Sequence, residues 1–204
     1  MGDLADALTD LSAIRPGSIV LARHGEPAIS RRVSLTAQGY REFWADYEER
    51  GLLPGQMPPP SLVNYCANAQ VLMSSTRPRA IESAQAVAGD REFDRVANFI
   101  EAPLPPPNLP TFIKMSPRFW GVVARFWWWW FDHNEGQETK RQAVIRSEQV
   151  AEQLAALAAS GQNVMVFAHG FFNYMIGQAL TRRGWRLAQS EGWKYWSMRR
   201  FEQK

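Results

Sequence analysis

Cysteine and long apolar runs are scarce in this sequence. Cys66 is the single cysteine among 204 residues, so the chain has neither a disulfide framework nor a cysteine metal site. No apolar stretch approaches the roughly 20 residues that span a bilayer. The acidic start lacks the apolar core of a secretory signal, and we therefore expect a cytoplasmic protein.

An excess of charge of one sign is also missing. The 23 Lys and Arg residues against 20 Asp and Glu residues give a net charge of +3, and no run of basic residues forms a stripe. Nucleic-acid-binding domains usually carry such a stripe. The sequence therefore predicts no nucleic-acid partner and weakly favours a small anionic substrate. Its length and its 46% apolar content fit one α/β domain over residues 1–204.

Three buried-strand candidates each run into a segment with basic or imidazole side chains. Residues 19–22, 71–73 and 164–168 are the strands, and the polar residues that follow them are Arg23, His24, Arg79 and His169. In an open α/β sheet, ligands bind at the carboxyl ends of the strands. We therefore expect these side chains to lie around one ligand. Gly25 follows His24, and its missing Cβ would let a ligand approach the backbone there.

The second of these segments begins a helix in an unusual way. Pro78 suits the first turn, but Arg77 and Arg79 oppose the helix dipole, which favours negative charge at that end. Cations placed there are explained if an anion lies between them and the helix amides. The alternative is two solvated surface arginines, and for Arg77 we favour the surface.

The remaining pattern predicts further elements. An aromatic helical face begins near Thr36, a Pro-rich surface connection covers residues 52–62, and a strand over residues 96–100 delivers Glu101. We also expect an amphipathic helix over residues 138–159 with Ile145 on its buried face, and a closing strand over 193–201. Residues 1–17 read as a short helix or loose arm.

Together these motifs resemble the histidine phosphatase (phosphoglycerate mutase-like) superfamily. The resemblance rests on the RHG motif followed by Glu26, on Ser74-Ser75 with the Arg79-Ala80 and Ser83-Ala84 pairs, and on His169-Gly170, in family order. It implies a three-layer α/β/α sandwich with a mostly parallel sheet and a small helical, Pro-rich cap.

The resemblance also implies roles. His24 would attack phosphorus to form a phosphohistidine, and Glu101 would protonate the leaving alcohol and then activate water. The phosphate oxygens would lie among Arg23, Arg79 and His169, with Gly25 and Gly170 beside them. Since cations replace the metal that other phosphatases use, we expect no metal and no cofactor.

Some positions depart from the family pattern. Ser30 stands where the family often has a phosphate-binding Asn, and by its position we assign it to phosphate binding. Glu101 is assigned by its position after a strand, with Glu26 and Glu138 as alternative acids. His133 is given no role beyond lining the pocket mouth.

Residues 103–137 read as the cap, and they contain five tryptophans, four of them consecutive. Three interpretations stay open: a cap helix that packs Trp120, Val123 and Trp127 on the sheet, a hydrophobic wall for an apolar leaving group, or an interfacial surface. An interfacial surface would contact a membrane or a second copy in a homodimer, with Arg118 and Arg125 flanking it.

The leading functional hypothesis is a metal-independent phosphatase that hydrolyses a small phosphomonoester through phosphohistidine. A phosphoglycerate mutase-like phosphotransferase uses the same chemistry. From a different class, the chain would be a catalytically idle phosphate-binding or scaffold protein that uses its aromatic surface for partners.

Overall fold

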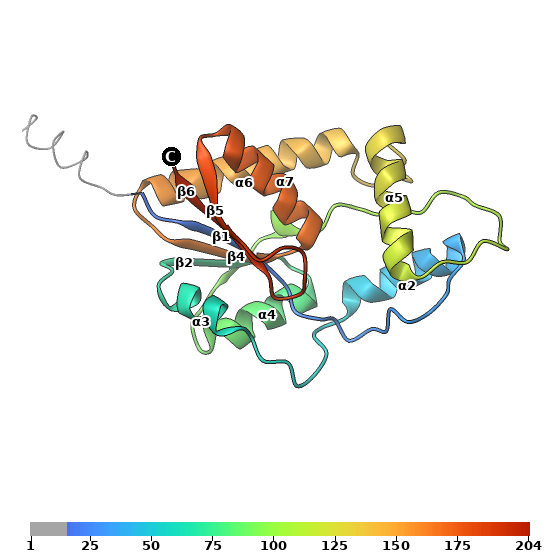
Figure 1. Ribbon diagram of the computed structural model, residues 1–204, viewed down its shortest axis with the longest axis horizontal. Helices are drawn as coiled ribbons and strands as arrows, with labels where there is room; N and C mark the ends of the chain where they lie inside the picture. The colour runs from blue at the N-terminus through green and yellow to red at the C-terminus, as the bar shows by residue number, and fades with distance from the viewer. Residues whose placement is uncertain (1–15) are drawn as a thin grey trace, which may run out of the picture.

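The computed structural model describes residues 16–204, so the expectation for the N-terminal arm lies almost wholly outside it. A six-stranded mixed sheet, in the order β3-β2-β4-β1-β6-β5, forms its centre (Figure 1). The strands are β1 (Ile19–Arg23), β2 (Val71–Ser74), β3 (Asp94–Arg95), β4 (Val164–Ala168), β5 (Trp185–Ser190) and β6 (Met198–Gln203). β1 to β4 are mutually parallel and β6 pairs antiparallel with both β1 and β5.

Helices cover both faces of this sheet, as the apolar runs of its central strands require. Successive residues of β1 enter opposite cores: Ile19 and Leu21 join one, Val20 and Ala22 the other. The first core is closed by α6 (Lys140–Ala159) and α7 (Gly170–Arg182), the second by α3 (Pro60–Ala67) and α4 (Pro78–Ala88). The predicted three-layer α/β/α fold is confirmed (Figure 1).

A smaller apolar cluster lies beyond the carboxyl ends of the parallel strands. It joins α2 (Ala37–Glu49) to α5 (Pro117–Phe131), where Tyr40 stacks on Trp120 at a ring separation of 5.8 Å. The Thr36 side chain caps α2, which begins where the sequence predicts. Figure 1 shows α2 and α5 together at one end of the molecule. We call these two helices, with the connections on either side of α5, the cap.

Three predicted elements are wrong in part. Residues 97–99 form a 3-10 helix, η1 (Ala97–Phe99), and β3 lies just before it. The proline-rich connection ends earlier than expected, because Pro60 occupies the first turn of α3, where its missing N–H costs nothing. The closing strand begins only at Met198, and β5 was not anticipated.

The buried faces of two helices differ in part from the predicted ones. α5 buries Trp120, Ala124 and Trp128, whereas Trp127 and Val123 are partly exposed. The reason is its partner: α5 packs on α2 and on Phe171, not on the strands. In α6, Ile145 is 48% exposed, so it lies outside the buried face.

No helix within residues 16–204 is long and apolar enough to cross a membrane. Cys66 is buried in α3, beneath the sheet, where burial raises the pKa of its thiol.

Candidate active site

A cavity of about 420 Å³ lies between the strand ends and the cap. Its floor carries Arg23, His24, Arg79 and His169, which follow β1, β2 and β4. Its walls come from the loop between β1 and α2, from α2 and α5, from the segment after η1 and from the loop before β6. The wall residues are Arg31, Tyr40, Phe43, Trp44, Tyr47, Glu101, Leu104, Pro117, Arg118, Gly121, Val122, Arg125 and Trp193. The four side chains expected together from the three strand ends therefore do line one cavity.

Adjacent parallel strands bring the two histidines together. Arg23 pairs with Ala168 in the sheet register, and the backbone N–H of His24 donates to the Ala168 carbonyl. The next residue on each strand is a histidine, and the two ring centres lie 5.2 Å apart. Both side chains are buried, with exposures of 2% and 1%.

The backbone fixes the tautomer of His24. Its Nδ1 lies 2.7 Å from the Gly25 carbonyl oxygen, and since a carbonyl only accepts, Nδ1 must donate. In the neutral ring this leaves the Nε2 lone pair free. Burial lowers the pKa of His24 well below its ordinary value, and the positive charges of Arg79 and Arg23 lower it further. The result is a neutral imidazole with a free Nε2, which is the form a nucleophile needs.

His169 is held on both nitrogens. Its Nε2 lies 2.9 Å from the Ser75 hydroxyl and its Nδ1 lies 3.3 Å from an Arg79 terminal nitrogen. Because Arg79 only donates, Nδ1 accepts and Nε2 donates to Ser75. Burial, followed by the charge of Arg79, lowers the pKa of His169 well below its ordinary value.

Arg79 is fully buried and anchored to the cap. Its terminal nitrogens donate to the Tyr47 carbonyl at 2.9 Å and to the Glu48 carboxylate at 2.7 Å, while its Nε has no partner within residues 16–204. The guanidinium lies 4.4 Å from the centre of the Tyr47 ring. Arg77 pairs with the other oxygen of Glu48 at 2.5 Å and is 37% exposed, which agrees with a surface position.

Arg23 is held by the loop that precedes β6. It donates to the Trp193 carbonyl and lies 4.5 Å from the Tyr195 ring centre. Its aliphatic part packs against Gly170, where a Cβ would come within 3.3 Å of its Nε. The ligand approach predicted for Gly25 is wrong: a Cβ there would lie 2.5 Å from the Trp196 indole, so the ring fills that space.

Glu101 lines the same cavity, between the floor and the cap. One carboxylate oxygen accepts from the backbone N–H of Phe172 at 2.8 Å and of Ala102 at 3.2 Å, and the other from Phe171 at 3.3 Å. The start of α7, which directly follows His169 in the chain, therefore holds this carboxylate in place. The alternative acids lie elsewhere: Glu26 is exposed outside the cavity lining, and Glu138 pairs with Arg146 at 2.6 Å.

Two residues that the sequence analysis associated with the site lie outside the cavity lining. Ser30 is exposed and its hydroxyl accepts from the Arg32 backbone N–H, so its position does not support the phosphate contact assigned to it. His133 lies 3.1 Å from the Pro106 carbonyl and does not line the mouth.

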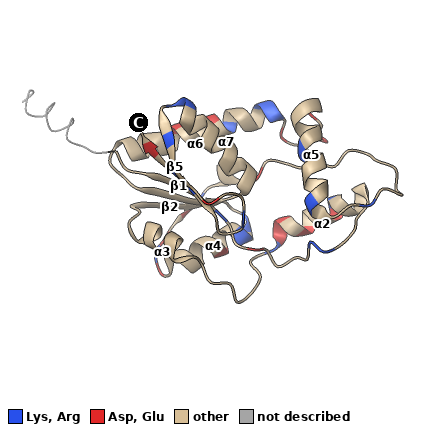
Figure 2. Cartoon of the chain, in the orientation of Figure 1, with Lys and Arg blue, Asp and Glu red and all other residues tan. Residues whose placement is uncertain are grey.

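Sequence reasoning missed three arginines of this cavity as ligand-facing groups. Arg31 lies next to Ser30 and donates to the Tyr47 hydroxyl at 2.8 Å. Arg118 and Arg125, read as flanks of an interfacial helix, both line the cavity instead. Basic positions on α5 and near the start of α2 are visible in Figure 2. The spacing of Arg118 and Arg125, seven residues apart on one helix, was the available signal.

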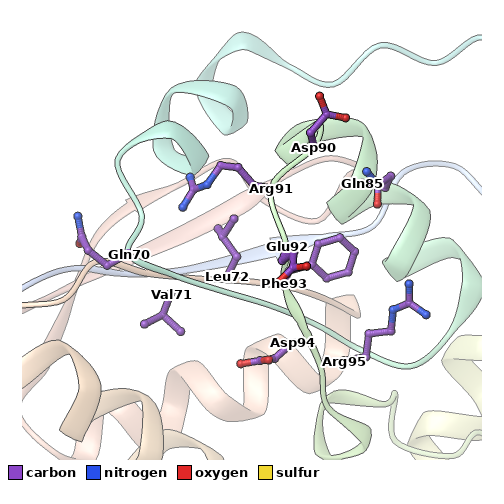
Figure 3. Close-up of a pocket in the computed structure, with 10 residues that line it drawn as sticks. All are labelled: Gln70, Val71, Leu72, Gln85, Asp90, Arg91, Glu92, Phe93, Asp94 and Arg95. Carbon is purple, nitrogen blue, oxygen red and sulfur yellow. The ribbon is translucent and has the colours of Figure 1, made fainter.

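A second hollow, of about 560 Å³, lies at the other side of the sheet beside β3 (Figure 3). No histidine lines it, and the guanidinium of Arg91 is taken up by the carbonyls of Cys66 and Ala69 at 2.5 and 2.7 Å. The histidines and arginines expected from the sequence to act on a phosphate line the first cavity and not this one.

A resident metal does not suit the donor set of the first cavity. Glu101 is its one carboxylate, beside five arginines. Within the described part of the chain, no group of three or more His, Cys, Asp or Glu side chains is arranged to hold a metal ion.

Comparison with known families decides the identity. Residues 55–203 match the model of the histidine phosphatase superfamily, branch 1. The chain belongs to the histidine phosphatase superfamily. The matched segment contains Arg79, Glu101 and His169, while the RHG motif lies before it.

Solved structures share the histidine phosphatase fold. Phosphoglycerate mutase from Bacillus anthracis has a TM-score of 0.57 at 17% identity, over 94% of this chain and 91% of that one. Phosphoserine phosphatase from Entamoeba histolytica, in complex with 3-phosphoglyceric acid, has a TM-score of 0.52 at 16% identity, over 81% and 80%. Mycobacterial glucosyl-3-phosphoglycerate phosphatase reaches 0.50 at 17% identity, over 82% and 81%. No curated protein matches the sequence.

Proposed function

We propose that this protein is a metal-independent phosphatase that hydrolyses a phosphomonoester through a phosphohistidine at His24. The observation that carries the proposal is the pair of buried, neutral imidazoles 5.2 Å apart, with Arg79 hydrogen-bonded to one and close enough to lower the pKa of the other.

In the first step, Nε2 of His24 attacks phosphorus. The N–P bond forms as the ester P–O bond breaks, and Glu101 gives its proton to the leaving oxygen. Arg23, Arg79 and His169 lie around the phosphoryl oxygens, over which the transition-state charge is spread. Of these three groups, Arg23 and Arg79 supply the positive charge that a bound metal supplies in other phosphatases.

In the second step, the carboxylate of Glu101 takes a proton from water. The water oxygen bonds to phosphorus, the N–P bond breaks, and the imidazole returns to its starting form. Inorganic phosphate then leaves. Gly25 supports the cycle through its carbonyl, which keeps the proton of His24 on Nδ1.

The test is turnover of 4-nitrophenyl phosphate in EDTA, with acid-quench trapping of a labelled phosphoenzyme. We expect turnover and an acid-labile label in the wild type, and a loss of at least about 10⁴-fold in His24→Ala. His133→Ala is the matched control, because this histidine lies outside the cavity lining.

Each other outcome would indicate a different function. A label that passes to an added alcohol in preference to water indicates a phosphotransferase. A folded protein that binds vanadate without turnover or label indicates a phosphate-binding role. Wild-type turnover in His24→Ala would refute the nucleophile assignment.

A further inference from the structure

We propose that Arg125 and Tyr40 form an anion-binding subsite in the cap, so that the leaving group of the substrate carries a second acidic group, a carboxylate or a second phosphate. This inference rests on the proposed function, because it assigns the substrate class of the same cavity.

The cavity has room for more than a phosphoryl group. Its volume of about 420 Å³ lies in the range of pockets that enclose small organic ligands. The groups that would hold the phosphoryl group all lie on its floor. The wall formed by α2 and α5 is therefore left to contact the leaving group.

Arg125 is a cation without an anion. It lies in the middle of α5, its Nε is buried without a partner, and none of its nitrogens makes a hydrogen bond or ion pair within residues 16–204. Burial lowers the pKa of this guanidinium below its ordinary value. A buried charge that lacks a partner is costly, so proteins rarely keep one without a use.

Neither of the protein groups next to Arg125 neutralises its charge. Its guanidinium lies 4.1 Å from the centre of the Phe171 ring, which contributes only a cation–π contact. Glu101 is near enough to raise the pKa of Arg125, but the backbone of α7 already holds its carboxylate and the two form no ion pair. The contacts therefore do not show Arg125 holding Glu101 in place.

Tyr40 supplies a second unpartnered polar group from the facing helix. Its side chain is 1% exposed, it lines the cavity, and its hydroxyl has no hydrogen-bond partner in the described chain. Burial raises the pKa of this phenol, so it stays a neutral donor. Buried hydroxyls are nearly always satisfied in folded proteins. Two donors from two helices, both unsatisfied and both facing one cavity, fit an acceptor that arrives with the ligand.

The experiment compares matched esters. One series pairs 3-carboxyphenyl phosphate with 3-carbamoylphenyl phosphate, which has the same shape without the charge, and a second pairs 1,3-phenylene bisphosphate with phenyl phosphate. We expect the charged member of at least one pair to be preferred in kcat/KM by about 10- to 100-fold, as charge-assisted hydrogen bonds imply. The series that shows the preference identifies the acid as carboxylate or phosphate.

Variants locate the preference. Arg125→Met removes the charge but keeps a chain over Phe171, and the ratio between paired esters should fall close to one. Tyr40→Phe should lower it by about 2- to 10-fold. Arg118→Met is the comparison variant, because Arg118 lines the same cavity from the same helix but at an exposed position. Its effect should be smaller and should fade with salt.

A thermal melt separates binding from a purely structural role. Because the buried Nε of Arg125 has no hydrogen-bond partner in the described residues, Arg125→Met should keep or raise the melting temperature. A lower melting temperature with equal losses on both esters would overturn the proposal, as would equal kcat/KM values for both members of each pair, or a ratio that collapses only in Arg118→Met.

Calorimetric binding of the same esters to His24→Ala makes the test independent of turnover. If no variant hydrolyses any ester, the proposed function fails. The subsite still stands if the charged esters bind more tightly and Arg125→Met abolishes the difference, and it falls if they do not.

Discussion

The two ends of the cavity are built on opposite plans. At the strand end, both nitrogens of His169, the Nδ1 of His24 and the terminal nitrogens of Arg79 are bound to protein groups. At the cap end, the hydroxyl of Tyr40 and the guanidinium of Arg125 have no hydrogen-bond partner in the described residues.

The difference separates two tasks. Groups that act on every substrate gain from being fixed before the substrate arrives, because preorganised donors need no rearrangement in the transition state. Groups that select among substrates must leave their hydrogen bonds open for the ligand. The comparison predicts that changes at the strand end affect all phosphomonoesters alike, whereas changes at the cap end depend on the leaving group.

The largest effect after loss of the nucleophile is expected at Arg79. Arg79→Met should lower kcat/KM by about 10³-fold, because the variant loses a buried positive charge beside the two histidines. The loss should be equal for charged and neutral leaving groups, measured with the paired esters. Arg77→Met is the control, since Arg77 binds the same Glu48 from an exposed position. A loss at Arg79 that follows the leaving-group charge would break the comparison.

Glu101 lies where the two ends meet, and its effect should depend on leaving-group basicity. Glu101→Gln should reduce turnover of an alkyl phosphate by about 10²-fold, because a poor leaving group needs the proton. Turnover of 4-nitrophenyl phosphate should change by less than about tenfold. Glu138→Gln, which alters a carboxylate paired with Arg146 outside the cavity, should change neither rate. Equal losses on both esters would remove Glu101 as the acid.

The strand end was predictable because the sheet determines it. A residue that directly follows a parallel strand must emerge at the shared edge, so Arg23, His24 and His169 could be brought together from their positions alone. Glu101 reached the cavity although the strand assigned before it is η1. Its position depends on the start of α7, whose N–H groups hold the carboxylate.

The cap end could not be predicted in the same way. Periodicity shows that α2 and α5 have apolar faces, but it does not show which partner each face meets. In α5 Trp120 is buried as predicted, but the second buried tryptophan is Trp128, one residue from the predicted Trp127, because the helix packs on α2 and Phe171. Arg125, on the same helix, lines the cavity. Arg125 and Tyr40 come together only through this tertiary contact.

The smallest predicted effect concerns stability against pH, and it belongs to the strand end. Burial and the charge of Arg79 lower the pKa of both His24 and His169 in the folded protein, whereas an unfolded chain has imidazoles of pKa about 6.5. Below about pH 6.5 the unfolded chain therefore binds protons that the folded protein does not. The free energy of unfolding must then fall as the pH falls, until the lowered folded values are reached.

Each buried histidine contributes up to about 1.4 kcal/mol per pH unit to this slope. Urea unfolding between about pH 5 and 7.5 measures it. His24→Asn and His169→Gln should each flatten the slope by one proton, because each variant removes one group that is kept neutral by folding. A wild-type slope in both strand-end variants would show that these imidazoles are protonated in the folded protein, and a neutral nucleophile at His24 would no longer be tenable.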